Sequence, residues 1–529
     1  NRECQRGDWK LHKAKCKRLT EIVVDTDVKN RLRTLALRRR LWTLSEGIVI
    51  LSIRDPDITT IGDMNLTEER AHLEAPFFQC KSLLRVDLKG CTKLTSLGSG
   101  AFWNCSSLTS LVLPDSLTQI GYGAFSRCTS LTSVVLPDSL TQLGDVAFGE
   151  CSSLTSMVLP DSLTRLGKAA FKKCTSLTSV VLPDSPTQLG KGAFAECSSL
   201  TSVVFPNNLT VLGETLFFQC TSLTSVVLPD SLTQLGQGAF AGCPSLTSVV
   251  LPDSLTQIGK RAFIMCSSLT SVVLPDSLTQ LGDDAFLECT SLTSVVFPNS
   301  LTVVGDNAFL ECTSLKSVVL PDSLTQLGKV AFARCSSLTS VVLPNSLTHL
   351  GEAAFQECTS LTSVVFPDSL TQIGEQAFAR CSSLLSVVLP DSLTQLGGGA
   401  FQQCTSLTSM VLPDSLTQLG EGAFAGCTSL TSVVFPDSLK QVGEGAFAAC
   451  PSLTSVVLPD SAVLGDDVFY LFDECDALLQ KAALAGFDSV ELYLRDRYKC
   501  ITLRKLVLRL LRKYNKAVNY ADGTEAEKH

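Results

Sequence analysis

The residues of this chain that could do chemistry are mainly cysteines and carboxylates, because histidine is scarce. The 529 residues include 22 cysteines and 51 Asp and Glu, but only four histidines. Sixteen of the cysteines recur every 23 residues, from Cys105 to Cys450. Asp115, Asp138 and Asp161 begin a second series with the same period. Catalysis needs a nucleophile, a base or a metal in convergent geometry, and residues that recur once per repeat do not indicate such a centre.

The aspartates form a column in any structure that stacks the repeats. Like charges about 4.8 Å apart repel unless each carboxylate accepts a hydrogen bond or a cation lies between them. Aspartate in Pro-Asp-Ser readily bonds local backbone N–H groups, so local bonding is favoured over calcium binding. His349 replaces the glutamine found at Gln142 and Gln372, which indicates a surface variant. We find no phosphate loop, nucleophile elbow or kinase signature, and we predict no enzymatic activity; the alternative is a substrate-recognition arm for a catalytic domain elsewhere.

The repeat cysteines have a structural interpretation. An identical position in each repeat places every cysteine beside its counterpart one strand spacing away, on an inner face. A small apolar residue with a weak S–H donor suits that place, so reduced packing residues are favoured. Disulfides along the column are the alternative, as expected in an oxidising compartment.

A different cysteine pattern lies near the N-terminus, where Cys4 and Gln5 are followed by Trp9, His12 and Cys16. This segment resembles the C-terminal part of a MYND-type zinc finger. The resemblance implies that Cys4 belongs to one zinc site, that His12 and Cys16 belong to a second, and that Gln5 and Trp9 contact a proline-containing peptide. Structural zinc sites need four ligands, so we expect residues upstream of Asn1 to complete the finger and this chain to hold no zinc. The resemblance also implies an intracellular protein of the cytoplasm or nucleus.

The period itself identifies the architecture. One repeat, residues 129–151, reads TSLTSVVLPDSLTQLGDVAFGEC. Leucines spaced in this way at a fixed period of 20–29 residues are typical of leucine-rich repeats. The unit resembles the BspA-type (treponemal) leucine-rich repeat over about residues 50 to 470, because a short strand ending near Pro is followed by Leu-Gly and Ala-Phe-x-x-Cys.

Alternation and turn residues predict the path of one repeat. Alternate strand residues point to opposite sides, Pro137 ends the strand, and Gly144 allows a tight corner. The apolar side chains expected inside are Leu131, Val134, Leu136, Leu140, Leu143, Ala147, Phe148 and Cys151. The predicted fold is a repeat solenoid with a parallel β-sheet on one face, short helical turns on the other and helical caps at both ends.

This organisation predicts four segments. Val28 to Leu44 has helical periodicity, and so does the C-terminal stripe formed by Leu503, Leu506, Val507, Leu510 and Leu511. The segments are a partial zinc finger (1–18), a helical linker or cap (19–49), the solenoid (50–470), and a C-terminal helical cap and tail (471–529).

Charge is distributed unevenly along the chain. Residues 1–45 carry a net charge of +8 and residues 495–529 carry +6, whereas the part between them carries −22. The acidic body disfavours nucleic acid as a specific partner, while the basic ends either contact an acidic partner or form solvated helices. No apolar run approaches the roughly 18 residues of a transmembrane helix.

These features together favour a non-catalytic scaffold that binds proteins through the solenoid and a peptide through the finger. The alternative is a cell-surface or secreted adhesin, and a binder of repetitive surfaces such as ice is a lesser one. Residues expected outside on the strand repeat almost unchanged, so a specific partner would use the variable helical-turn side, at Lys172, Lys173, Lys260 and Arg261. Neutral drift is the other explanation of that variation. The oligomeric state is not predicted.

Overall fold

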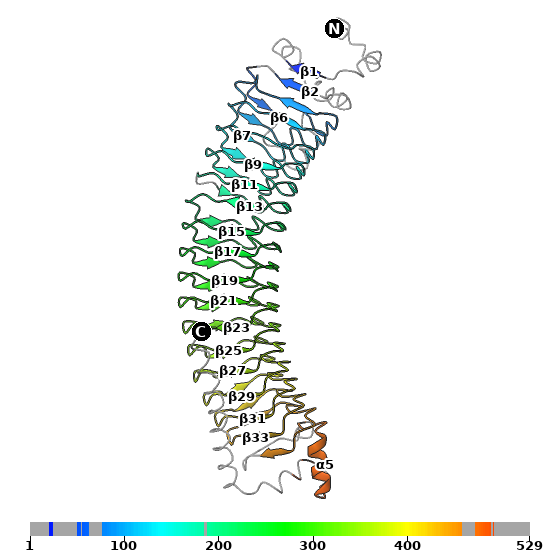
Figure 1. Cartoon of the computed structure of the whole chain (residues 1–529), viewed down its shortest axis with the longest axis vertical. Coiled ribbons are helices and arrows are strands. Elements are labelled where there is room, and N and C mark those ends of the chain that lie inside the picture. The colour runs from blue at the N-terminus through cyan, green and yellow to red at the C-terminus, as the bar shows by residue number, and fades with distance from the viewer. Residues whose placement is uncertain are drawn as a thin grey trace. The chain divides into compact units, whose positions relative to one another are not determined.

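The computed structural model describes most of the repeat region and short pieces on either side of it. It describes residues 21–24, 50–53, 56–62, 77–184, 188–457, 471–487, 490 and 493. The chain divides into two compact units, Asn1–Ser254 and Leu255–His529. In each unit the chain winds through successive turns of one repeat each, and each turn stacks on its neighbour (Figure 1). This confirms the predicted leucine-rich-repeat solenoid with its 23-residue period.

A regular turn contributes one three-residue strand and one two-residue strand. Both pair in parallel with the equivalent strands of neighbouring turns, so Ser179 lies opposite Ser156 on one side and Ser202 on the other. Paired residues are one whole repeat apart in the sequence, so equivalent side chains face the same way in all turns. The strands are short because Pro follows the longer one and Gly follows the shorter one, and neither residue suits a strand interior.

In the first unit the longer strands are β1 (Glu21–Val24), β2 (Ile50–Ile53), β4 (Arg85–Asp87), β6 (Ser110–Val112), β9 (Ser156–Val158), β11 (Ser179–Val181), β13 (Ser202–Val204), β15 (Ser225–Val227) and β17 (Ser248–Val250). The two-residue strands are β3 (Thr60–Ile61), β5 (Ser96–Leu97), β7 (Gln119–Ile120), β8 (Gln142–Leu143), β10 (Arg165–Leu166), β12 (Gln188–Leu189), β14 (Val211–Leu212) and β16 (Gln234–Leu235).

In the second unit the longer strands are β19 (Ser271–Val273), β21 (Ser294–Val296), β23 (Ser317–Val319), β25 (Ser340–Val342), β27 (Ser363–Val365), β29 (Ser386–Val388), β31 (Ser409–Val411), β33 (Ser432–Val434) and β35 (Ser455–Val457). The two-residue strands are β18 (Gln257–Ile258), β20 (Gln280–Leu281), β22 (Val303–Val304), β24 (Gln326–Leu327), β26 (His349–Leu350), β28 (Gln372–Ile373), β30 (Gln395–Leu396), β32 (Gln418–Leu419) and β34 (Gln441–Val442). One helix is described, α5 (Asp476–Leu484).

The third side of each turn is not helical, which corrects the prediction of short helical turns. Phe148 N–H donates to the Ala170 carbonyl of the next turn at 2.8 Å, whereas Cys151 N–H donates back to the Phe148 carbonyl at 3.3 Å. Val146 and Glu150 have φ values of 55° and 59°, which an α-helix does not contain. Alternate N–H groups therefore leave the turn to bond its neighbour, and a helix would have kept them all within one segment.

The predicted core is confirmed. All eight side chains expected inside the repeat that ends at Cys151 are buried. Phe148 belongs to a column of stacked rings, with centroids 5.2 Å from Phe125 and 5.5 Å from Phe171. A second column in the other unit includes Phe309 and Phe332, whose ring centroids are 5.0 Å apart. Each phenylalanine therefore packs against the same residue of the neighbouring turns.

The glycine after each two-residue strand allows the turns to approach closely. A Cβ atom placed on Gly167 would lie 2.3 Å from the carbonyl carbon of Gly144, and one on Gly328 would lie 2.4 Å from that of Gly305. Real Cβ atoms do not come that close to backbone atoms. Glycine is therefore required at this position by the backbone of the preceding turn.

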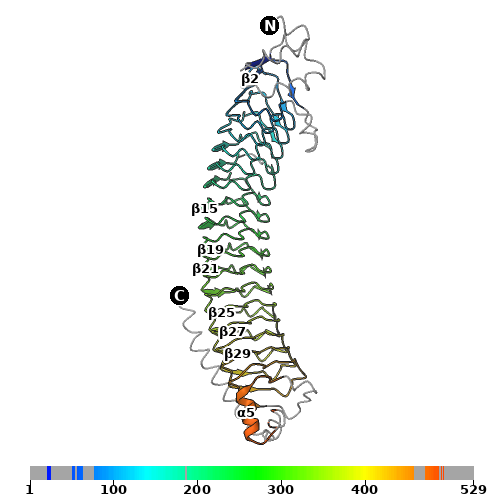
Figure 2. The ribbon, with the colours of Figure 1, turned by 90° about the vertical axis from the view of Figure 1, so that its right-hand side faces the viewer.

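At the N-terminal end, the described residues differ in part from the predicted helical cap. Within the predicted linker 19–49, Glu21–Val24 form β1, which pairs in parallel with β2 and so satisfies hydrogen-bonding groups at the edge of the sheet; the rest of that segment lies outside the described residues. At the other end α5 confirms helix in part of 471–529 (Figure 2); its Leu478 and Ala482 are buried, and Ala477 N–H donates to the Pro451 carbonyl. Among the described helical residues, no segment is long and apolar enough to cross a membrane.

We predict that Gly328→Ala lowers the urea midpoint of unfolding, because the added methyl group must displace the backbone of Gly305. Overpacking of this kind costs about 1–3 kcal/mol. The matched control is Gln326→Ala, an exposed residue of the same turn, which should leave the midpoint almost unchanged. Equal midpoints for the two variants would contradict the proposed close approach.

Candidate interaction surfaces

Two exposed surfaces run along the turns, and they differ in how much they vary. The first is the valine face, formed by the outward valine that ends each three-residue strand. Its exposed members are Val158, Val181, Val204, Val227 and Val250 in the first unit, and Val273, Val296, Val319, Val342 and Val365 in the second. The second is the turn face, formed by the residues between the repeat glycine and the repeat cysteine, such as 145–150.

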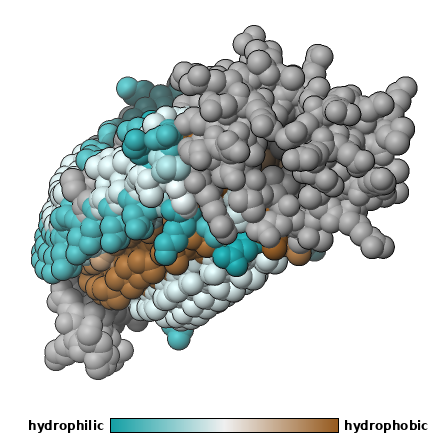
Figure 3. Space-filling view, turned by 90° about the horizontal axis from the view of Figure 1, so that it is seen from above, coloured by the Kyte–Doolittle hydropathy of each residue, from teal (hydrophilic) through white to brown (hydrophobic). Residues whose placement is uncertain are grey.

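The valine face is apolar and repetitive. In the space-filling view, hydrophobic atoms form a band along the turns between bands of less hydrophobic residues (Figure 3). The neighbouring threonines do not project free hydroxyl groups, because Thr178 Oγ1 donates to the Thr155 carbonyl at 3.0 Å and Thr201 Oγ1 donates to the Thr178 carbonyl at 3.1 Å. A surface that repeats itself at each turn does not distinguish one position along its axis from another.

The turn face carries the four basic residues that the sequence singled out, and each of them is paired with an acid of the following turn. Lys172 and Lys173 both contact Glu196, at 3.1 and 3.6 Å. Arg261 contacts Asp284 at 3.1 Å, and Lys260 pairs with Asp283. The hydrogen bond to Asp283 raises the pKa of Lys260 and lowers that of Asp283. The four basic side chains remain exposed, with relative areas between 43% and 64%.

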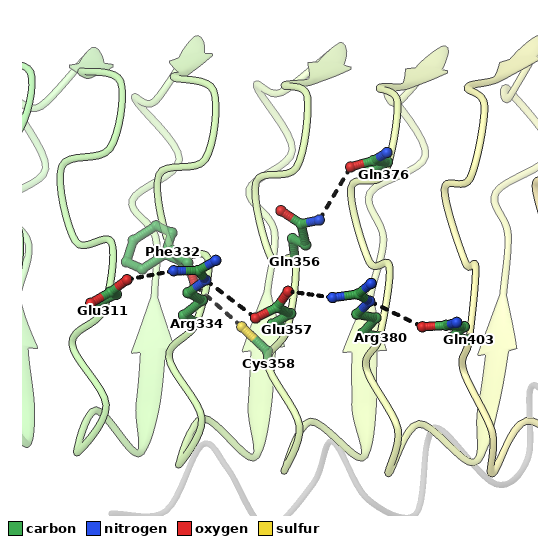
Figure 4. A network of polar contacts seen from close by, with 9 residues as sticks. All are labelled: Glu311, Phe332, Arg334, Gln356, Glu357, Cys358, Gln376, Arg380 and Gln403. Atoms are coloured by element: carbon green, nitrogen blue, oxygen red, sulfur yellow. Dashed lines mark hydrogen bonds and ion pairs between the residues drawn. The ribbon is translucent and has the colours of Figure 1, made fainter.

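A longer ion-pair ladder lies on the turn face of the second unit (Figure 4). Arg334 contacts Glu311 at 2.6 Å and Glu357 at 3.2 Å. Arg380 then contacts Glu357 and Gln403, both at 3.0 Å. The prediction from sequence missed this ladder, although opposite charges at one repeat position in consecutive repeats would have revealed it. Exposed pairs contribute only about 0–1 kcal/mol each, so a partner can exchange them for its own charges.

The repeat cysteines form a buried column between these surfaces. All 19 cysteines that the structure describes are buried, and none of them forms a disulfide bond. Thiols of the regular repeats donate to the phenylalanine carbonyl of the preceding turn, as Cys174 Sγ does to Phe148 at 3.2 Å and Cys358 Sγ does to Phe332 at 3.2 Å. Burial raises the pKa of Cys151 from 9.0 to about 12. A protonated, enclosed thiol is not a nucleophile, so this column serves packing.

Comparison with known proteins agrees with this geometry. Residues 74–175, 141–270, 187–309, 233–362, 281–408 and 348–478 each match the BspA type leucine-rich repeat region. The chain belongs to the BspA-type leucine-rich-repeat family. No match was found among curated proteins.

Solved structures of bacterial proteins resemble this BspA-type chain. A leucine-rich repeat protein from Bacteroides ovatus is 28% identical, with 74% of this chain and 91% of that chain covered and a TM-score of 0.53. A leucine rich cell surface protein from Faecalibacterium prausnitzii is 30% identical, with 56% and 82% covered and a TM-score of 0.39. A T. pallidum leucine-rich repeat protein is 29% identical, with 39% and 77% covered and a TM-score of 0.27.

Two aspartates of the column in these BspA-type repeats accept hydrogen bonds from backbone N–H groups of the next turn and not from the local ones expected. Asp161 Oδ1 accepts a hydrogen bond from Asp184 N–H of the next turn at 3.2 Å, and Asp322 Oδ1 accepts one from Asn345 N–H at 3.3 Å. His349 is exposed and its Nδ1 lies 2.8 Å from Thr348 Oγ1. Within the described residues no group of three or more His, Cys, Asp or Glu is arranged to hold a metal ion.

The residues assigned to the zinc finger, namely Cys4, Gln5, Trp9, His12 and Cys16, lie outside the described residues. Their chemistry alone does not complete a zinc site. Cys4 offers one ligand to the first site and His12 with Cys16 offers two to the second, whereas structural zinc takes four. That this chain holds no zinc ion stays a prediction.

Thiol titration tests the cysteine column. Without reductant, denatured protein should yield nearly all 22 thiols, while native protein near neutral pH should yield at most Cys4, Cys16 and Cys500, because the rest are enclosed. The protection should fail as pH rises from about 9 toward 12, since the raised pKa of Cys151 favours folding only while that thiol is neutral. Recovery of half the thiols or fewer would contradict a reduced column and support the secreted adhesin instead.

Metal analysis tests the finger assignment. After dialysis, the 529-residue chain should retain clearly less than one zinc ion per molecule, because neither site has four ligands. His12→Ala and Cys16→Ala should not change that content. Stoichiometric zinc that both substitutions remove would show that the ligand assignment is wrong.

Proposed function

We propose that this chain is a non-catalytic protein-binding solenoid whose specific partner contacts the turn face. One observation carries the proposal: exposed residues on the turn face differ from turn to turn, while those on the valine face repeat. Lys172, Lys173 and Glu196 form one charge pattern, whereas Glu311, Arg334 and Glu357 form another. Recognition of one partner over others depends on such placed charges.

Because these charges form ion pairs within the chain, a partner could replace one member of a pair with a charge of its own. Each basic residue is held beside its acid by the 23-residue register, so the turn face presents fixed dipoles instead of free cations. A partner that brings its own carboxylate to Arg261 or its own amine to Asp284 replaces one exposed pair with another. Because such pairs are weak in water, the exchange costs little, and burial at an interface strengthens them.

The remaining chemistry of the described part does not favour catalysis. The thiols that could act as nucleophiles are buried, with a raised pKa in cases such as Cys151 and Cys289. The chain between the basic ends carries a net charge of −22, which repels a polyanion such as nucleic acid. A protein or peptide is therefore the partner class that we propose.

We further propose that the N-terminal segment is a peptide-recruiting MYND-type module when its zinc sites are complete. Gln5 and Trp9 would contact the peptide, and Cys4, His12 and Cys16 would hold zinc together with ligands that this sequence does not contain. The support is the spacing of these residues. A reducing intracellular compartment, in the cytoplasm or nucleus, is the matching proposal for localisation, and buried cysteines without disulfide bonds support it.

Charge changes in the full chain test the turn-face proposal, with partners captured by crosslinking from a cell extract. Lys172→Glu with Lys173→Glu in the first unit, or Lys260→Asp with Arg261→Asp in the second, should lower capture of a saturable partner by about tenfold, the effect of losing 1–2 kcal/mol of charge contacts. Val158→Thr, Val181→Thr and Val204→Thr on the valine face should leave capture unchanged.

A charge swap separates recognition from stability. Lys260→Asp combined with Asp283→Lys restores the pair of neighbouring turns in reversed order. Capture should stay low in the swap if a partner recognises these charges, and should recover if the single change only weakened the fold. Loss of capture by the valine changes alone would refute the proposal.

A further inference from the structure

One column of residues on the turn face of the first unit alternates in charge. It is formed by the residue before each repeat cysteine, which in four consecutive turns is Arg127, Glu150, Lys173 or Glu196. We call these four residues the first-unit ladder. Arg127 contacts Glu150 at 3.2 Å, and Lys173 contacts Glu196 at 3.6 Å. Among the described residues, no ion pair joins Glu150 to Lys173, so the ladder is interrupted at its centre.

The backbone holds this ladder at a fixed spacing. Glu150 N–H donates to the Lys172 carbonyl of the next turn at 2.7 Å, and Lys173 N–H donates to the Ala195 carbonyl at 2.9 Å. Equivalent residues of hydrogen-bonded turns lie about 4.8 Å apart. The side chains of the ladder are between 27% and 50% exposed, so their charges are accessible to another molecule.

A ladder of this kind, with an even number of alternating charges, is complementary to its own reverse. A two-fold axis between Glu150 and Lys173, in the plane of the contact, would place a second copy of the chain antiparallel to the first. Glu150 of each copy would then face Lys173 of the other, and Arg127 would face Glu196. Two-fold interfaces use the same patch on both chains in this way. The second copy would therefore supply the pairing that is absent from the centre of the ladder.

A second column of the turn face is complementary in the same register. It lies five residues before the first-unit ladder, and in the same four turns it consists of Tyr122, Asp145, Lys168 and Lys191. Asp145 of each copy would face Lys168 of the other, and the uncharged Tyr122 would face Lys191. Lys168 and Lys191 are exposed. No like charges meet in this column, so both columns favour the same arrangement.

The strip between the two columns allows the copies to approach. Lys172 is the longest side chain there, and across the interface it would face Gly149, which has no side chain. Val146 would face Ala169, which is also small. The charges of the two columns can therefore meet without a steric barrier between them.

Other arrangements of two copies place like charges together. An axis at Glu150 itself would set Glu150 against Glu150 and Arg127 against Lys173. A parallel pair would exchange the two columns, which sets Glu150 against Asp145 and Lys173 against Lys168. Like charges across an interface select against such arrangements. The charge pattern therefore specifies one antiparallel register.

The second unit is less complementary to itself. Its ladder from Glu311 to Arg380 also alternates in charge (Figure 4). A two-fold axis between Arg334 and Glu357 would, however, place Asp306 against Glu375 in the column five residues before it. That repulsion would occur twice, because a two-fold axis repeats every contact. The first unit is therefore the better surface for a second copy.

We propose that the turn face of the first unit binds a second copy of this chain, antiparallel, about a two-fold axis between Glu150 and Lys173. The inference rests on the proposed role of the turn face and names its partner. Four turns span about 19 Å at about 4.8 Å each. An interface of this length is small and charged, so we expect a weak dimer with a dissociation constant on the order of micromolar.

Sedimentation velocity of the purified full chain tests the dimer. We expect a monomer–dimer equilibrium in the micromolar range that weakens as salt is added, because salt screens exposed charges. Glu150→Lys and Lys173→Glu should each raise the dissociation constant at least about tenfold, since each variant places like charges across the axis. An equimolar mixture of the two variants should associate again, because in the mixed dimer every introduced charge faces an opposite one.

The mixture also shows that both variants are folded, since misfolded chains would not regain association. Lys329→Glu, which breaks an exposed ion pair with Glu352 in the second unit, is the matched control and should leave the dissociation constant unchanged. A chain that stays monomeric throughout the micromolar range would overturn the inference. So would a dimer that Lys329→Glu weakens equally, or two variants whose mixture does not associate. If the chain is monomeric while Lys172→Glu with Lys173→Glu still lowers capture of a different protein, only this inference fails and the proposed function stands.

Discussion

Hydrogen bonding between successive turns is the constraint on which the rest of this structure depends. A turn of 23 residues contains no helix and no hairpin, so its buried N–H and C=O groups need partners in the turns before and after it. Strand residues find them in parallel register, and Phe148 finds one at Ala170 of the next turn. An unpaired buried backbone group costs about 1–3 kcal/mol, so one change of register would be penalised along the whole stack.

This register places identical residues beside one another, and each column keeps a residue type that tolerates its own copy. Phenylalanine rings stack, and thiols donate to the carbonyl of the preceding turn. Glycine permits a backbone approach that a Cβ atom would prevent. Carboxylates do not tolerate their copies equally well. In one part of the turn face acids and bases therefore alternate, at Glu311, Arg334 and Glu357.

This repeat register also determines what each of the two exposed surfaces is able to recognise. The exposed valines repeat the same strand position from turn to turn, so the valine face offers apolar area that does not distinguish one turn from another. The turn face has room for variation because its side chains point to solvent and only the backbone must keep register. A binding protein built on this solenoid can therefore change its specificity there without altering the stack.

By itself the sequence determined the period, the eight inward positions of a repeat and the packing role of the cysteines. All of these follow from spacing, because a residue repeated every 23 positions meets its own copy. Only the tertiary structure decided that the third side consists of linked turns, that Lys172 and Lys173 share Glu196, and that β1 joins the sheet. These depend on which group of a neighbouring turn satisfies each donor, and Ala-Phe-x-x-Cys is equally compatible with a helix until that neighbour is present.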